Sequence, residues 1–183
     1  MTNLKVDLGC GDKKVPGTVG VDIEKLPGVD IICNLERLPW PFKDSSFEEI
    51  YCSHLLEHFF DTVKIMEEIY RIAKNNALVN IIVPHVSYEG AFRDPTHKSF
   101  FTYRTFEYYT TEVDNIPSYY SKARFKIEKE KLIFVKKYRP LRFIIEKIAN
   151  RFPRLYENAW MWIFPANTLE IRLKVVKPSE ECQ

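Results

Sequence analysis

A glycine turn near the start of the chain is the first group of residues that could bind a ligand. The segment Asp7-Leu8-Gly9-Cys10-Gly11 follows a short apolar run. Glycines at such a turn permit positive φ angles and let backbone N–H groups approach a nucleotide-like ligand closely. Asp22 closes the next apolar run, where a carboxylate can accept hydrogen bonds from both hydroxyls of a ribose. Lys14 occupies the third glycine position of G-x-G-x-x-G, so the segment does not match the dinucleotide signature.

A second group of chemically capable residues is His54-Leu55-Leu56-Glu57-His58, which matches the H-x-x-E-H pattern of inverted zinc peptidases. On a helix, His54 and His58 would share a face and could bind one zinc ion. That site would need a third protein ligand and a cleft of a different topology. The pattern by itself therefore leaves a zinc-dependent hydrolase open as one interpretation.

The elements that must position these residues alternate between strands and helices. Five short apolar runs predict strands, and they lie at residues 4–8, 19–23, 29–33, 49–52 and 77–83. Between the fourth and fifth runs, apolar side chains recur at helical spacing over 63–73, with Asp61 as the expected N-cap. Such alternation predicts an α/β domain with a parallel sheet, in which ligands bind at the carboxyl ends of the strands.

The first connection in this predicted sheet is unusually short. Only seven residues, 12–18, separate Gly11 from Val19. A parallel crossover that includes a helix normally needs at least about 10 to 12 residues. We therefore expect the first helix to be missing or reduced to a turn.

The second half of the chain contains two predicted insertions. Residues 85–121 are rich in aromatic side chains and lack a strand period, which favours a lid or substrate-binding insertion after the fifth strand. Runs at 124–138 and 168–177 predict the late strands that close the sheet. A helical insertion is expected at 139–167. We expect one domain over residues 1–183, because no linker or repeat divides the chain.

The helical insertion has an apolar face. Pro140 opens a predicted helix whose apolar residues share one side; they are Leu141, Ile144, Ile145, Ile148 and Phe152. We expect this face to pack as a cap on the sheet, although basic residues beside it also allow contact with a membrane surface or a partner helix. The segment Trp160–Phe164 is expected to belong mainly to the core.

The composition excludes several classes of protein. The 183 residues, 45% hydrophobic and 28% charged, are ordinary for a globular domain with one buried core. A formal net charge of +2 gives no broad basic surface, so no nucleic-acid partner is expected. No apolar run approaches the roughly 18 to 20 residues of a transmembrane helix, and no signal peptide is recognisable. The four cysteines form no C-x-x-C pair, which favours a reducing, cytoplasmic location.

Taken in order, the motifs resemble one family. The series consists of D-x-G-x-G, the acidic Asp22, the segment 34–50 and Ser53-His54-Leu55-Leu56-Glu57-His58. Over roughly residues 4–84 it resembles the class I S-adenosylmethionine-dependent methyltransferases of the type 11 group. This resemblance implies S-adenosylmethionine as cofactor. It also implies a Rossmann-like, mostly parallel seven-stranded sheet with helices on both faces and an antiparallel last strand.

The resemblance also assigns residues to the cofactor. It implies that Asp7, Gly9 and Gly11 line the methionine end, that Asp22 binds the ribose, that Asn34 and Leu35 flank the adenine, and that Ser53 and His54 face the sulfonium. The family usually has Asp where Asn34 stands. Asn keeps both an acceptor and a donor, so recognition of the adenine amino group can survive the change.

Methyl transfer to a hydroxyl or an amine requires alignment of the acceptor and removal of a proton. His85 follows the fifth predicted strand, and His97 lies in Asp94-Pro95-Thr96-His97, a segment that recurs in sequences resembling this group. Because imidazole titrates near neutrality, His85 and His97 are the candidate bases.

These observations predict methyl transfer from S-adenosylmethionine to an oxygen or nitrogen of a small-molecule acceptor. Two alternatives remain. A non-catalytic S-adenosylmethionine-binding or scaffold protein would explain the short first crossover and Asn34, and a zinc hydrolase would use the H-x-x-E-H segment. That segment directly follows a predicted strand behind D-x-G-x-G, which fits the methyltransferase pattern better. We therefore assign no residue to a metal.

Overall fold

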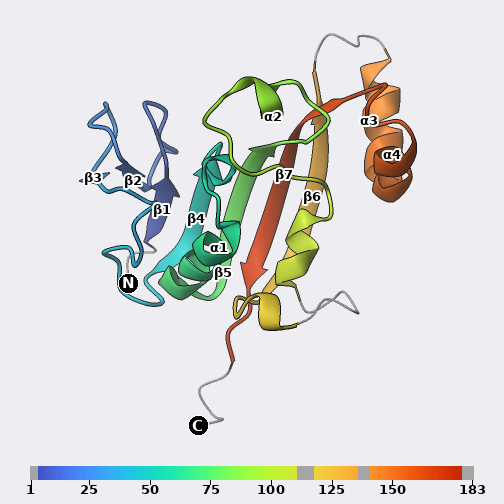
Figure 1. Ribbon diagram of the computed structural model, residues 1–183. Helices are drawn as coiled ribbons and strands as arrows, with labels where there is room; N and C mark the ends of the chain where they lie inside the picture. Colours follow the sequence, from blue (N-terminus) through green and yellow to red (C-terminus); the bar gives the residue numbers. More distant parts are fainter. Residues whose placement is uncertain (1–3, 111–117, 136–140, 179–183) are drawn as a thin grey trace.

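The computed structural model describes residues 4–110, 118–135 and 141–178 and has a seven-stranded sheet at its centre (Figure 1). The strands are β1 (Lys5–Leu8), β2 (Val19–Asp22), β3 (Ile31–Ile32), β4 (Phe47–Ser53), β5 (Ala73–Pro84), β6 (Phe125–Phe134) and β7 (Ala166–Val175). Their order is β3-β2-β1-β4-β5-β7-β6. Strands β1 to β5 pair in parallel, and β7 is antiparallel to both of its neighbours. The predicted sheet, including the antiparallel last strand, is therefore confirmed.

The helices are short, apart from α1 and α3. They are η1 (Leu56–His58), α1 (Thr62–Ile72), α2 (Gly90–Arg93), η2 (Thr105–Tyr109), η3 (Ser118–Tyr120), α3 (Arg142–Arg151) and α4 (Pro153–Ala159). Asp61 is the N-cap of α1, as expected, because its side chain accepts a hydrogen bond from the Lys64 N–H at 3.1 Å. None of the helices in the described part of the chain combines the length and the apolar character that crossing a bilayer requires.

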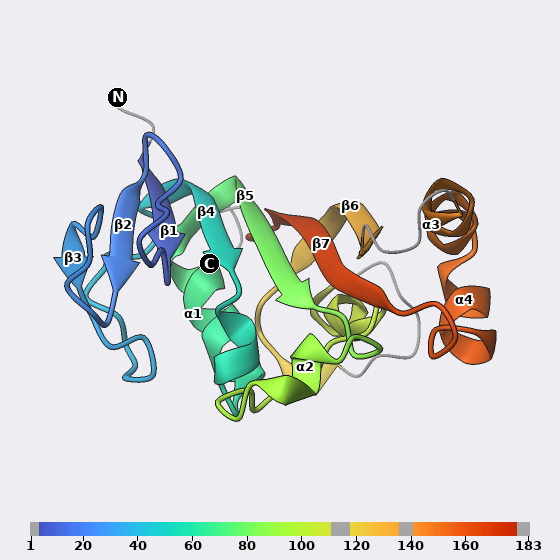
Figure 2. The ribbon, with the colours of Figure 1, turned by 90° about the horizontal axis from the view of Figure 1, so that it is seen from above.

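The prediction of helices on both faces of the sheet is correct for one face only. Seen from above, α1 and α2 lie on one side, while α3 and α4 lie beyond β6 (Figure 2). The covered face is apolar, with one buried row across four strands formed by Val6, Ile50, Val79 and Leu173. No helix of the described residues covers the opposite face.

The reason for the open face is the length of two connections. In a doubly wound sheet, the crossovers from β1 to β2 and from β2 to β3 put their helices on the face opposite to α1. Here residues 12–18 and 23–30 contain no helix, which confirms the prediction about the first crossover. Polar side chains on the open face bond to one another instead: Glu49 accepts from Lys5, Tyr51 and Asn80.

The helical insertion packs differently from expectation. Within α3, the buried residues are Ile145 and Ala149, and the rest of the predicted apolar face is exposed. Trp162 and Ile163, expected in the core, are also exposed. Asn150 explains this orientation, because its side chain bonds to the backbone N–H and C=O of Leu132 on the edge strand β6. The helix therefore caps a strand edge and leaves its apolar row in solvent.

Candidate functional site

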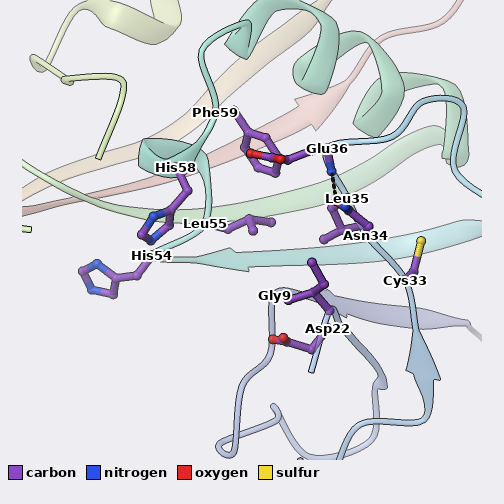
Figure 3. Close-up of a pocket in the computed structure, with 11 residues that line it drawn as sticks. Gly9, Asp22, Cys33, Asn34, Leu35, Glu36, His54, Leu55, His58 and Phe59 are labelled. Carbon is purple, nitrogen blue, oxygen red and sulfur yellow. Dashed lines mark hydrogen bonds between the residues drawn. The ribbon is translucent and has the colours of Figure 1, made fainter. Parts of the chain in front are cut away.

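A cavity of about 360 Å³, the first pocket, lies at the carboxyl ends of β1, β2 and β4 (Figure 3). It is lined by Gly9, Asp22, Ile23, Cys33, Asn34, Leu35, Glu36, His54, Leu55, His58 and Phe59. This is the edge at which ligands bind in parallel α/β sheets. Its volume falls in the usual range for a small-molecule site.

The glycine turn after β1 forms one wall of the first pocket. Gly9 and Gly11 have φ angles of 67° and 55°, a region that favours glycine. A Cβ atom on Gly9 would lie 2.7 Å from Cδ1 of Leu55, so a side chain there would require Leu55 to shift, in addition to the positive φ. The bare backbone at Gly9 is therefore open to close approach by a ligand.

Asp22 stands beside this turn at the end of β2. One of its carboxylate oxygens accepts the Gly11 N–H at 2.9 Å, and the other accepts the Glu24 N–H at 3.1 Å. These two bonds fix the orientation of the carboxylate on the pocket wall. Each oxygen keeps a lone pair that could accept a hydrogen bond from a ribose hydroxyl.

Asn34 and Leu35 form the opposite part of the wall. The Asn34 side-chain oxygen accepts the Glu36 N–H at 2.9 Å, as drawn in Figure 3. Leu35 is buried, and with Leu55 and Phe59 it gives the pocket apolar walls suited to a flat ring. The bond to Glu36 occupies one of the two lone pairs of the Asn34 oxygen, so one remains for an adenine amino group.

Five of the eight residues assigned to the cofactor line the first pocket; they are Gly9, Asp22, Asn34, Leu35 and His54. Asp7, Gly11 and Ser53 do not. Asp7 is buried beneath the turn and accepts the Val15 N–H at 2.8 Å, and its burial raises the pKa of its carboxyl group. Asp7 therefore holds the loop that replaces the missing first helix.

A second cavity of about 440 Å³, the second pocket, adjoins the first. It is lined by His54, Pro84, Tyr88, Gly90, Arg93, Asp94, Pro95, His97, Asn167 and Thr168. Six of these residues belong to the insertion at 85–121. His54 lines both cavities, so its imidazole stands at the boundary between them.

The backbone and the side chain of His54 are both held in place. Its φ angle is 53°, an uncommon conformation for a residue other than glycine and one found repeatedly at functional sites. The ring atom Nδ1 lies 3.1 Å from a carboxylate oxygen of Glu57, which is only 1% exposed. The hydrogen bond to Glu57 raises the pKa of His54. A buried carboxylate thus orients an imidazole at the junction of two pockets, which the sequence analysis did not foresee.

The segment Asp94-Pro95-Thr96-His97 packs against η1 at this junction. The Thr96 hydroxyl lies 3.0 Å from Nδ1 of His58 and donates to Asp94 at 2.7 Å, so it accepts the His58 N–H. His97 lines the second pocket, and its Nδ1 bonds to the Ala91 carbonyl oxygen at 3.0 Å. Both imidazoles therefore carry their proton on Nδ1 and keep the lone pair on Nε2.

His85, the other predicted base, lies elsewhere. It is completely buried and lines neither pocket. Its Nδ1 lies 2.8 Å from the Ser87 hydroxyl, and its Nε2 lies 3.0 Å from a Glu157 carboxylate oxygen. This placement argues against His85 as the base, because a base must reach the acceptor. The residue instead ties the end of β5 to α4.

The structure does not form the zinc-peptidase arrangement. That arrangement needs an α-helix with both histidines on one face, whereas η1 begins only at Leu56 and has three residues. His54 bonds to Glu57 instead of facing a common ion with His58. Glu57, His58 and His97 do bring one possible ligand atom each within 4.8 Å of one another. The side-chain hydrogen bonds of these three residues run to His54, Thr96 and Ala91 and not to one another. That no residue binds a metal stays a prediction.

Comparison with known proteins agrees with the geometry. Residues 16–81 match the model of a methyltransferase domain family. No curated protein matches the chain. Among solved structures, the chain is similar to the YcgJ protein from Bacillus subtilis, with 16% identity, a TM-score of 0.60, and coverage of 96% of this chain and 93% of that one. A SAM dependent methyltransferase from Archaeoglobus fulgidus gives 19% identity, a TM-score of 0.55, and coverage of 94% and 86%.

A third similar structure shows that this fold does not determine the reaction. The [4+2]-cyclase SpnF has 14% identity, a TM-score of 0.57, and coverage of 95% of this chain and 74% of that one. At such identities the likeness concerns the fold, and the chemistry must be argued from the site. The methyltransferase family match, residues 16–81, contains every first-pocket residue except Gly9. The chain is therefore similar to S-adenosylmethionine-dependent methyltransferases: residues 16–81 match a methyltransferase domain family, and the fold is shared with a solved S-adenosylmethionine-dependent methyltransferase.

Proposed function

We propose that this protein is an S-adenosylmethionine-dependent methyltransferase, which methylates an oxygen or nitrogen of a small-molecule acceptor held in the second pocket. The observation that carries the proposal is the position of His54, which lines both pockets and is oriented by Glu57. A group that removes the acceptor proton must stand where the acceptor meets the cofactor.

The first pocket fits the cofactor. The backbone of Gly9 is accessible to a ligand because this residue has no side chain, and Asp22 presents a carboxylate of fixed orientation. The apolar walls are formed by Leu35, Leu55 and Phe59. S-adenosylmethionine supplies a methyl group on a positively charged sulfur, already activated for in-line displacement. In this proposal Asp22 holds the ribose and Leu35 contacts the adenine.

The second pocket supplies the acceptor site. Its walls include Arg93, Asp94 and His97 from the insertion, together with Asn167 and Thr168 at the start of β7. Such a lining can accept and donate hydrogen bonds and can pair with a charged group. We infer that the acceptor is polar and that residues 85–121 determine its identity. In this proposal, the function of the predicted insertion at 85–121 is to recognise the acceptor.

His54 is the proposed base. Because its Nδ1 faces the Glu57 carboxylate, the neutral ring carries its lone pair on Nε2. This Nε2 would take the proton of the acceptor, and the bound cofactor would supply the methyl group. His97 remains the second candidate, since it also lines the second pocket and its Nδ1 is bonded to the Ala91 carbonyl oxygen.

The test separates binding from turnover. S-adenosylhomocysteine is titrated calorimetrically into wild-type, His54→Asn and His97→Asn proteins, and turnover is followed as release of S-adenosylhomocysteine across a panel of polar hydroxyl and amine acceptors. We expect binding near one per chain in all three proteins. We expect His54→Asn to lower turnover by about 10²-fold to 10⁴-fold, the usual contribution of a general base.

Each other outcome has a definite meaning. Absence of S-adenosylhomocysteine binding by the wild-type protein would refute the assignment of the first pocket. Binding without turnover on any acceptor would favour the non-catalytic alternative. If His97→Asn loses turnover while His54→Asn keeps it, the base is His97.

A further inference from the structure

Helices α3 and α4 form a hairpin, residues 141–164, that projects beyond the edge strand β6 (Figures 1 and 2). Asn150 anchors it through two hydrogen bonds to the backbone of Leu132, at 2.7 and 2.9 Å. Ile145 and Tyr156 are buried on its inner side. The outer side of the hairpin has no partner among the described residues.

Eight large apolar side chains lie exposed on this hairpin, each between 39% and 74%. They are Leu141, Phe143, Ile144, Ile148, Phe152, Leu155, Trp162 and Ile163. Single exposed apolar residues are normal, but monomeric proteins rarely gather this many on one segment. A surface of this kind marks a region that contacts something apolar.

Basic side chains accompany the apolar ones. Lys147, Arg151 and Arg154 are exposed on the same hairpin. On α3, Lys147 and Arg151 lie one turn apart and border the row that contains Ile144 and Ile148. Long basic side chains beside an apolar row are typical of helices that lie in the interface of a membrane.

The acidic residues of the hairpin face inward. Glu146 pairs with Lys131 and Arg142, and Glu157 bonds to His85. The sequence has no other Asp or Glu between residues 141 and 164. The exposed charge of the hairpin is therefore entirely positive.

We propose that this hairpin docks on an anionic lipid surface and lies in the interface without spanning it. Its apolar side chains would enter the headgroup region, and its three exposed cations would meet lipid phosphates. Phe143, Phe152 and Trp162 have the aromatic character enriched at that depth. A second copy of the chain fits less well, because a two-fold symmetric contact would bring the same cations together.

The proposal is tested by sedimentation of the full chain with vesicles, without cofactor or acceptor. The vesicles are phosphatidylcholine alone, or phosphatidylcholine with one third phosphatidylglycerol. An apolar variant carries Phe143→Ser, Ile144→Ser and Trp162→Ser, and its control carries Phe60→Ser, Tyr119→Ser and Val176→Ser, which are exposed apolar residues elsewhere.

A second pair of variants tests charge. One carries Lys147→Glu, Arg151→Glu and Arg154→Glu, and its control carries the same reversal at three exposed lysines outside the hairpin, Lys25, Lys43 and Lys122. Each basic residue near an anionic surface contributes about fivefold to the partition coefficient. The hairpin reversal should therefore lower binding by at least about a hundredfold, and the control much less.

The expected result is binding to the anionic vesicles that weakens as salt is raised and is lost in both hairpin variants but in neither control. Absence of wild-type binding would overturn the proposal, as would binding that the hairpin variants retain. If light scattering instead shows a wild-type dimer that the apolar variant dissociates, the surface belongs to a second copy. Because no cofactor is present, none of these outcomes depends on methyl transfer.

Discussion

Replacing Glu57 with glutamine removes the charge that orients His54 while keeping the shape of the side chain. Glu57 is 1% exposed, and one of its oxygens lies 3.1 Å from Nδ1 of His54. Its other oxygen, Oε2, is buried without a hydrogen-bond partner among the described residues. In Glu57→Gln, the amide oxygen can still accept the Nδ1 proton and the amide nitrogen can occupy the position of Oε2.

The size of the effect follows from the hydrogen bond that changes. A hydrogen bond to a charged partner contributes about 1.5–3 kcal/mol, against about 0.5–1.5 kcal/mol between neutral groups. The loss of charge therefore lowers the stability of protonated His54 by about 1–1.5 kcal/mol before allowance for solvent, which lowers its pKa. The side chain of His54 is 55% exposed, so solvent reduces the effect. We expect the pKa of His54 to fall in the variant.

The sign of the pH effect follows from the proposed role of His54 as the base. A base works in its neutral form, so turnover rises as pH rises through the pKa of His54, which the bond to Glu57 raises in the wild-type enzyme. In Glu57→Gln the rising limb of the turnover profile should move toward lower pH, while the plateau changes by less than about tenfold. The measurement is S-adenosylhomocysteine release at saturating cofactor between pH 5 and 9.

Glu48→Gln is the matched control, because Glu48 pairs with Lys74 at the opposite end of β4. Its pH profile should coincide with that of the wild-type enzyme. A Glu57→Gln enzyme whose rising limb stays in place would refute the argument that the Glu57 charge sets the ionisation of the base.

Three other predictions concern the cofactor site and stability. Gly9→Ala should weaken S-adenosylhomocysteine binding at least about tenfold and destabilise the fold by about 1–2 kcal/mol, because φ is 67° and the new methyl group would meet Leu55. Calorimetry measures the affinity and urea unfolding measures the stability. An unchanged affinity would contradict this prediction. Burial and the nearby Glu107 raise the pKa of Glu130 to about 7. The free energy of unfolding should therefore decrease as pH rises from about 4.5 to 7, by about 1–2 kcal/mol after allowance for partial exposure. In urea titrations, Glu130→Gln should make the free energy of unfolding less dependent on pH over this range. Treatment with a chelator should leave S-adenosylhomocysteine affinity unchanged, and a loss restored by zinc would revive the metal interpretation.

The sequence by itself determined the features that depend on residues close to one another in the chain. Seven residues between Gly11 and Val19 cannot contain a crossover helix, and none is present. The apolar runs gave the strands, because a buried parallel strand must be apolar along its length. Gly9 and Asp22 could be placed at the ligand edge, because Gly9 directly follows β1, Asp22 is the last residue of β2, and the carboxyl ends of these strands meet there.

Only the tertiary structure decided which histidine stands at the junction of the pockets. His54, His85 and His97 all follow strands or lie in loops near the same edge. From the sequence, resemblance assigns His54 to the cofactor, and His85 and His97 are the candidate bases. The packing of residues 94–97 on η1 brings His97 to the second pocket, while a bond to Glu157 turns His85 into the core. The same holds for the apolar face of α3, which Asn150 turns toward solvent. Each of these outcomes depends on a contact between residues far apart in the chain, and local patterns of apolar and polar residues carry no information about such contacts.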